Sequence, residues 1–208
     1  MNQSPQRRLA AIFFADIVGF TSMMQKDEKA TLAKLARYKE VLTNEVNNHG
    51  GQVFQTYGDG SLCMLPSSVS AVECARSIQQ KLRQSPEVPI RIGIHIGDIV
   101  QREKTIYGDA VNLASRVESL GVPHSVLFTE RVADDLKSHP EFTTKNLGPF
   151  LFKNVSEEMD VYALTNDNLP VPERDEMKGK LDGKSGGRIN IRNLLIAAGI
   201  FLVAIFGI

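Results

Sequence analysis

Two aspartates at the ends of extended segments are the first candidates for chemistry. Asp16 directly follows the apolar run at residues 9–15, and Asp59 lies in the turn Gly58-Asp59-Gly60. Hard cations such as Mg²⁺ bind carboxylate and backbone oxygens together with substrate phosphates. Paired metal ions about 3.5–4 Å apart can activate an attacking oxygen and stabilise a leaving one. If the fold brings the two aspartates together, they predict a two-metal site; taken singly, each also fits a turn or a helix cap.

A second polar pair lies later in the chain. Asn112 and Arg116 are four positions apart, so they share one face of a predicted helix at about 108–120. Ala110 and Ala114 fall on roughly the opposite face, which suits packing. The Asn/Arg face could add polar contacts to a substrate site, although alone it equally fits a solvated surface.

The elements that must position Asp16 and Asp59 follow from hydrophobic periodicity. The run at 9–15 suits a strand buried on both faces. Asp27 can cap a helix that follows it, and residues 52–57 and 61–65 are typical of two strands joined by a Gly/Asp turn. A second helix begins after Pro66. The apolar faces are Leu32, Leu35, Tyr38, Leu42 and Val46 in the first helix and Val72, Ala75, Ile78 and Leu82 in the second.

Residues 90–97 give the clearest strand pattern, because isoleucine fills every even position. The odd positions are Arg91, Gly93, His95 and Gly97. We expect one apolar face, and a second face that two glycines keep open and that carries two polar side chains.

The order of these elements is β-α-β-β-α-β, which predicts an α+β, ferredoxin-like core. In that arrangement the third strand fills the gap between the first two. The end of the first strand and the turn between the second and third therefore meet at one sheet edge, which places Asp16 beside Asp59. Backbone N–H groups of the glycine-containing loop at residues 18–21 could hold phosphate oxygens there.

The remaining chain predicts a C-terminal extension, a linker and an apolar end. A short strand at 126–128 and strands at about 147–153 and 160–164 complete a domain over residues 1–165. Asn, Asp, Pro, Lys and Gly dominate the next segment, and we expect residues 166–188 to be a polar linker.

The end of the chain predicts a membrane helix over residues 189–208. Leu194–Ile208 holds no charge, but fifteen residues at about 1.5 Å each fall short of the roughly 30 Å hydrocarbon core. Either the helix includes residues 189–193 or the chain is cut within a longer span. A buried helix is the alternative. The preceding segment is rich in Lys and Arg, which marks the cytoplasmic side and predicts that the folded domain lies on the cytoplasmic side of the cell membrane.

Composition excludes several classes of protein. The chain has 208 residues, 42% of them hydrophobic, enough for one sizeable core. Lys plus Arg and Asp plus Glu are both 24, so the formal net charge is zero. The sequence has no basic stripe with interleaved aromatics, so it gives no indication of a nucleic-acid partner. Cys63 and Cys74 lie in apolar surroundings and fit buried thiols, and no Cys/His spacing predicts zinc. The short apolar run near the start argues against a cleavable signal peptide.

Five motifs in sequence resemble the class III adenylyl and guanylyl cyclases. The order and spacing agree over residues 8–165. The motifs are FADIVGFT at 14–21, YGDG at 57–60, RIGIHIG at 91–97, YGDAVNLASRVES at 107–119 and LGPFLFKNV at 147–155.

The resemblance implies a role for each candidate residue. It implies a homodimer with two shared active sites, in which the aspartates come from one subunit and the Asn/Arg pair from the other. Asp16, Asp59 and the carbonyl of Ile17 would ligate two Mg²⁺ or Mn²⁺ ions per site. Asn112 would orient the ribose, and Arg116 would stabilise charge on the α-phosphate. The triphosphate would contact the Gly19, Phe20 and Thr21 loop, Arg91 and Lys153.

One departure from the family concerns the nucleotide base. The adenine-selecting lysine of many adenylyl cyclases falls at Gln55, and its partner position is Thr105. A lysine only donates, whereas Gln and Thr can each donate or accept. We expect ATP as substrate, with GTP or dual specificity as the alternative.

Two other functions compete with catalysis. A pseudo-cyclase that binds nucleotide without turning it over fits Gln55, but it has no chemical need for the complete metal and Asn/Arg set. A diguanylate cyclase also has a ferredoxin-like palm, but this chain lacks the GG(D/E)EF signature of that family.

Overall fold

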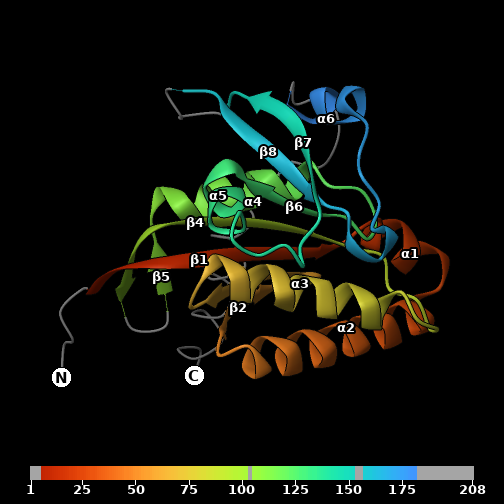
Figure 1. The fold of residues 1–208 in the computed structure, drawn as a ribbon. Helices are drawn as coiled ribbons and strands as arrows, with labels where there is room; N and C mark the ends of the chain where they lie inside the picture. The colour runs from red at the N-terminus through yellow and green to blue at the C-terminus, as the bar shows by residue number, and fades with distance from the viewer. Residues whose placement is uncertain (1–5, 103–104, 153–156, 182–208) are drawn as a thin grey trace, which may run out of the picture.

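The computed structural model describes residues 6–102, 105–152 and 157–181. Within this part of the chain, eight strands form one sheet in the order β2-β3-β1-β4-β6-β8-β7, with β5 paired to β4 (Figure 1). The strands are β1 (Gln6–Ile17), β2 (Gln52–Tyr57), β3 (Gly60–Leu65), β4 (Ile90–Arg102), β5 (Thr105–Tyr107), β6 (Val126–Thr129), β7 (Thr144–Phe150) and β8 (Met159–Leu164). The helices are α1 (Phe20–Lys26), α2 (Glu28–Asn48), α3 (Ser68–Leu82), α4 (Asp109–Ser119), α5 (Glu130–Asp135) and α6 (Arg174–Leu181).

The ferredoxin-like core is confirmed. Strand β3 lies between β1 and β2 and is antiparallel to both, and β4 pairs antiparallel with the other side of β1. The predicted turn at Asp59 and the end of β1 at Ile17 therefore lie at the same edge of the sheet. Helix α1, directly after β1, is an element that the apolar pattern did not predict.

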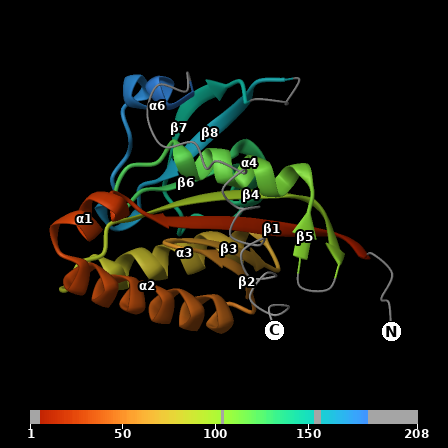
Figure 2. The same cartoon turned by 180° about the vertical axis from the view of Figure 1, so that it is seen from behind.

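Helices α2 and α3 cover one face of the sheet, and α4 lies on the other (Figures 1 and 2). The cap of α2 is as predicted, since the Asp27 side chain accepts a hydrogen bond from the Ala30 backbone N–H. Tyr38, Leu42 and Val46 are fully buried, as are the four predicted residues of α3. Leu35 is only partly buried and Leu32 is 47% exposed, so these two predicted positions of α2 differ from the expectation.

The second face of β4 is not open, contrary to the expectation from its odd positions. Helix α4 packs directly on it. A Cβ added to Gly93 would lie 2.1 Å from the Glu118 backbone nitrogen, and one on Gly97 2.9 Å from the Ala110 Cβ. The glycines therefore allow helix and strand to approach closely. His95 is also buried beneath this layer, with Nδ1 2.8 Å from the Thr129 hydroxyl.

Residues 166–177 are not a free linker, and that part of the expectation is wrong. Arg174 donates hydrogen bonds to the carbonyls of Leu147 and Pro149 in β7 and stacks over the Phe150 ring. Met177 is fully buried against β7 and β8. Leu169 is also buried in the core, and Asp167 forms an ion pair with Arg76 on α3. A few apolar and charged side chains thus dock a segment whose overall composition is polar.

Other expectations have mixed outcomes. Cys63 and Cys74 are free and buried as predicted, and burial raises the pKa of both thiols. Within residues 6–102, 105–152 and 157–181, no helix is long and apolar enough to cross a membrane. The expected span over residues 189–208 lies outside the described residues, as do residues 182–188 of the expected linker.

Candidate active site

Asp16 lies at the end of β1 and faces a positive charge on the neighbouring strand. It is directly opposite Arg91 in the β1–β4 register. The Arg91 Nη2 donates to Asp16 Oδ2 at 3.1 Å, and the two side chains are 22% and 26% exposed. Asp16 is therefore both charge-compensated and accessible to a ligand.

Asp59 lies next to Asp16 in the β2–β3 turn, as the topology predicts. Gly58 adopts a positive φ of 60°, which glycine allows without strain and which helps form this tight turn. Partial burial, and then the negative charge of Asp16, raise the pKa of Asp59 to about 6. A cation bound between the two carboxylates would offset the repulsion between their charges.

The donor set at this edge fits Mg²⁺ or Mn²⁺. These ions prefer oxygen ligands and accept a few carboxylates completed by backbone carbonyls, waters and phosphates. Asp16 and Asp59 supply two carboxylates, and the carbonyl of Ile17 follows Asp16 in the chain. In the described parts of the chain, no group of three or more His, Cys, Asp or Glu side chains offers a complete cage. Waters, and phosphate oxygens when a nucleotide is bound, would therefore complete the coordination.

The loop after β1 presents backbone N–H groups beside Asp16. Val18 N–H is used, because it donates to the Pro89 carbonyl at 2.8 Å. Gly19 has a φ of 76° and caps α1, so Phe20 and Thr21 form the first turn of that helix. The first N–H groups of a helix have no partner within it. They are suited to phosphate oxygens.

Arg91 also binds an acid that the sequence analysis did not single out. Its Nε lies 2.5 Å from Oε1 of Glu118 on α4, and its Nη1 donates to the Ser119 carbonyl at 3.2 Å. Glu118 follows Ala114 by four positions, so it falls on the buried face of α4. A charged residue on an apolar helix face was the signal that could have revealed it.

Asn112 and Arg116 lie on the other side of α4. Asn112 is exposed and Arg116 is partly exposed, while Ala110, Ala114 and Val117 are buried against the sheet. The structure thus brings Asp16, Asp59 and Arg91 together, but it turns the Asn/Arg pair away from the sheet.

The remaining predicted residues divide into two sets. Gln55 is exposed on β2, and Thr105 begins β5, which lies against β2. Two neighbouring elements thus carry the residues expected to contact the base. Lys153 lies outside the described residues.

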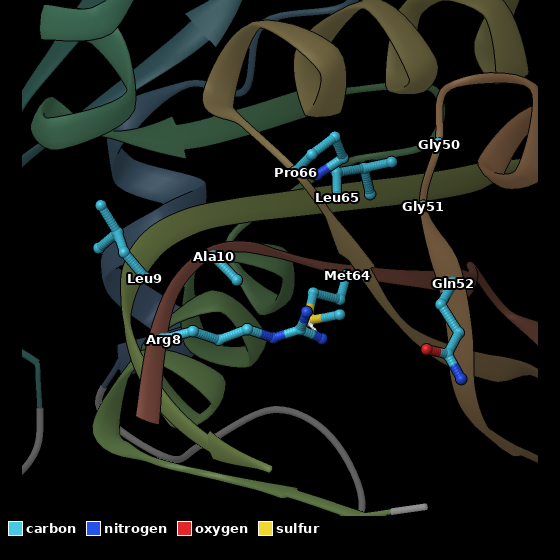
Figure 3. Close-up of a pocket in the computed structure, with 9 residues that line it drawn as sticks. All are labelled: Arg8, Leu9, Ala10, Gly50, Gly51, Gln52, Met64, Leu65 and Pro66. Carbon is cyan, nitrogen blue, oxygen red and sulfur yellow. Dashed lines mark hydrogen bonds between the residues drawn. The ribbon is translucent and has the colours of Figure 1, made fainter. Parts of the chain in front are cut away.

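A pocket of about 400 Å³ lies at the opposite end of β1 from Asp16 (Figure 3). Arg8, Gly51, Met64 and Pro66 are among its lining residues, and the Arg8 Nη2 lies 3.1 Å from the Met64 sulfur. None of the predicted site residues lines it. The candidate active site at Asp16 and Asp59 is therefore separate from this pocket.

Solved structures share the fold. The crystal structure of the adenylate/guanylate cyclase/hydrolase from Silicibacter pomeroyi matches with a TM-score of 0.73 and 31% identity, over 79% of this chain and 100% of that one. The adenylyl cyclase CyaB from P. aeruginosa matches with a TM-score of 0.72 at 22% identity, over 79% and 97% of the chains. The fold is therefore that of nucleotidyl cyclase domains.

Sequence comparison gives the family. The adenylate and guanylate cyclase catalytic domain matches residues 3–166. A Rhizobium meliloti (strain 1021) protein, provisionally named adenylate cyclase 3, is 37% identical over 168 residues, which cover 77% of this chain and 29% of the relative. The adenylate cyclase of Streptomyces coelicolor is 33% identical over 132 residues, 62% and 34% of the two lengths. The chain belongs to the class III nucleotidyl cyclase catalytic domain family, and it spans about a third of these two relatives.

Proposed function

We propose that the chain converts ATP to 3′,5′-cyclic AMP and pyrophosphate, as a homodimer with two shared active sites. One observation carries this proposal. Asp16 and Asp59 meet at one sheet edge, whereas Asn112 and Arg116 occupy the outward face of α4. A second copy of the chain would supply the pair that each metal edge lacks.

The chemistry is an in-line displacement in which the ribose 3′-oxygen attacks the α-phosphorus and pyrophosphate leaves. Two divalent ions, Mg²⁺ or Mn²⁺, would supply positive charge to the attacking and leaving oxygens. Asp16, Asp59 and the Ile17 carbonyl would hold these ions.

The other residues would position the substrate and stabilise the transition state. Backbone N–H groups of the Gly19, Phe20 and Thr21 loop would donate to phosphate oxygens, with Arg91 and Lys153 on the outer phosphates. Asn112 from the partner would orient the ribose for attack. The partner's Arg116 would donate to the charge that develops on the α-phosphate. We assign no general base.

ATP is the proposed substrate because the named relatives are adenylate cyclases. Gln55 could donate to adenine N1 and Thr105 could accept from the exocyclic amine. The same groups could also turn to serve guanine, so a guanylyl or dual-specificity cyclase is the alternative.

Mixing two inactive variants tests the shared sites. Asp59→Ala and Arg116→Ala should each be inactive alone, and a mixture should regain part of the activity, because a heterodimer rebuilds one of its two sites. The assay is purified protein with Mn²⁺ and ATP or GTP, with products separated by chromatography. No recovery where heterodimers are shown to form would refute the shared-site arrangement. A wild type inactive with both nucleotides would favour the pseudo-cyclase.

We also propose that residues 189–208 anchor the chain in the cell membrane with the catalytic domain on the cytoplasmic side. The support is the charge-free run Leu194–Ile208 behind a basic segment. Cells expressing the chain with and without 189–208 are fractionated. A full chain that stays soluble after high-speed centrifugation, as the truncated one should, contradicts the anchor.

A further inference from the structure

Arg91 joins two elements that belong to different halves of the proposed site. Its Nη2 donates to Asp16 at the end of the sheet where Asp16 and Asp59 meet, which we call the metal edge. Its Nε pairs with Glu118 on the helix that carries Asn112 and Arg116. The three charges form a chain of acid, base and acid. Both contacts come from one guanidinium, but they use different nitrogens, Nη2 for Asp16 and Nε for Glu118.

Glu118 is the more firmly held of the two acids. Its side chain is 10% exposed, against 26% for Asp16, and Oε1 has no solvent contact. Its backbone rests on Gly93 so closely that even a methyl group there would clash. A buried carboxylate that loses its cation is costly. The ion pair between Arg91 and Glu118 should therefore persist when Asp16 binds another partner.

This arrangement matters when a cation approaches Asp16. An unanchored arginine would move fully onto Asp16 and compete with the cation for the carboxylate. Glu118 instead takes a share of the Arg91 charge and fixes the guanidinium through Nε, and the Ser119 carbonyl holds Nη1. Only Nη2 points to Asp16, so Asp16 can turn to a metal while Arg91 keeps its partner.

We propose that Glu118 is a positioning residue for the metal edge: it anchors Arg91 beside Asp16, so that a divalent cation can bind Asp16 without displacing an arginine. The inference rests on the proposed function, because it takes Asp16 as a metal ligand. It adds a residue on α4 that acts on metal binding through Arg91 and touches neither metal nor nucleotide itself.

Mn²⁺ alone is the probe, titrated into the full chain in detergent while the electron paramagnetic resonance signal of free Mn²⁺ is recorded. Glu118→Gln keeps the shape of the side chain and removes its charge. Since coupling within such networks is typically about fivefold or more, we expect Mn²⁺ affinity to fall by about that factor. Glu130→Gln, the same change at an exposed position on α5, should bind Mn²⁺ as the wild type does. Glu118→Gln within twofold of wild type overturns the proposal.

A double-mutant cycle separates positioning from a simple charge effect. If Glu118 acts through Arg91, Glu118→Gln should change Mn²⁺ affinity by less than about twofold in an Arg91→Gln background. An equal loss in both backgrounds means that Glu118 acts through space, and the positioning role is wrong. Should Glu118→Gln fail to fold in a thermal melt, Glu118→Asp keeps the charge but shortens the reach to Nε, and the same fall in Mn²⁺ affinity is expected.

Asp16→Asn distinguishes failure of this inference from failure of the proposed function. It should abolish the Mn²⁺ binding seen in the wild type. If it binds Mn²⁺ as the wild type does, Asp16 is not a metal ligand, and both the proposed function and the role of Glu118 fall. If it loses Mn²⁺ while Glu118→Gln keeps it, only the role of Glu118 is refuted.

Discussion

The metal edge and the outward face of α4 differ in how the fold positions their side chains. At the edge, Asp16, Arg91 and Glu118 are linked by ion pairs across two strands and a helix. On α4, Asn112 and Arg116 lie on the face away from the sheet, while the inner face is packed. The metal edge is therefore positioned within one copy of the chain, whereas the outward face of α4 would join a site only against a second copy. We call these the two halves of the proposed site. Changes to the two halves should therefore have different consequences.

The largest expected effect is a loss of catalytic rate in a variant of the outward face of α4 that still binds metal normally. Arg116→Ala should lower kcat by about 10²–10³-fold, because it removes one contact to the transition state. Its Mn²⁺ affinity should equal that of the wild type, since the side chain lies outside the metal edge. Activity assays paired with Mn²⁺ titration check this. Loss of Mn²⁺ binding in Arg116→Ala would remove the distinction between the halves.

The next effect is on the packing that joins the halves. Gly93→Ala places a Cβ 2.1 Å from the Glu118 backbone, so α4 must move off β4. Overpacking against backbone should cost about 3 kcal/mol of the free energy of unfolding. Urea unfolding measures it. Gly60→Ala is the control, because its nearest contact would be an ordinary 3.6 Å. Equal stabilities of the two variants would mean that α4 is not tightly seated.

A smaller effect concerns pH and the histidine beneath α4. Burial, and then the charge of Arg131, lower the pKa of His95 from 6.5 to about 4. Between those values the unfolded chain binds a proton at His95 that the folded chain does not, so the contribution of His95 to the free energy of unfolding falls as pH drops from about 6.5 to 4. The loss due to His95 should be about 2 kcal/mol. Urea unfolding of the wild type and of His95→Asn at several pH values isolates this contribution, because the raised pKa of Asp59 acts in the opposite direction over the same range in both proteins. The stability advantage of the wild type over His95→Asn should shrink as pH falls; a constant difference would show that His95 makes no such contribution.

The smallest effect concerns the base. Gln55→Lys replaces a group that donates or accepts with one that only donates, so the ratio of ATP to GTP turnover should rise by about five- to tenfold, near 1 kcal/mol. Parallel assays with the two nucleotides measure it. Product formation from GTP at ten times the rate from ATP in the wild type would contradict the ATP assignment.

The core could be predicted because it depends on local periodicity and topology. The isoleucines of β4 and the apolar helix faces fixed the element order, and the order alone placed Asp16 beside Asp59. Periodicity states which residues share a face, but not what lies on it. It therefore missed α4 over Gly93, and with it the contact of Glu118 with Arg91.

The C-terminal segment shows a second limit of sequence patterns. Residues 166–177 are polar in composition, yet Asp167 pairs with Arg76 on α3, while Arg174 and Met177 dock the end of the segment on β7 and β8. Composition averages over a segment, whereas docking depends on a few side chains and on a receptive surface formed elsewhere in the fold. Helix α1 was missed for a different reason: it has only seven residues, and its apolar side chains Phe20 and Met23 are only partly buried against the core.

The pairing of Asp16 with Arg91 has a consequence for how the chain acquires its site. The two residues are 75 positions apart and meet only when β4 adds to β1. Contacts of such long range form late, since the loop between them must be closed first. A chain emerging from the ribosome therefore lacks the Arg91 contact to Asp16 until β4 has been synthesised and paired. Earlier, Asp16 and Asp59 belong to an incomplete sheet whose β1 edge is still unpaired, which makes that interval the one in which the nascent chain is most exposed to misassociation.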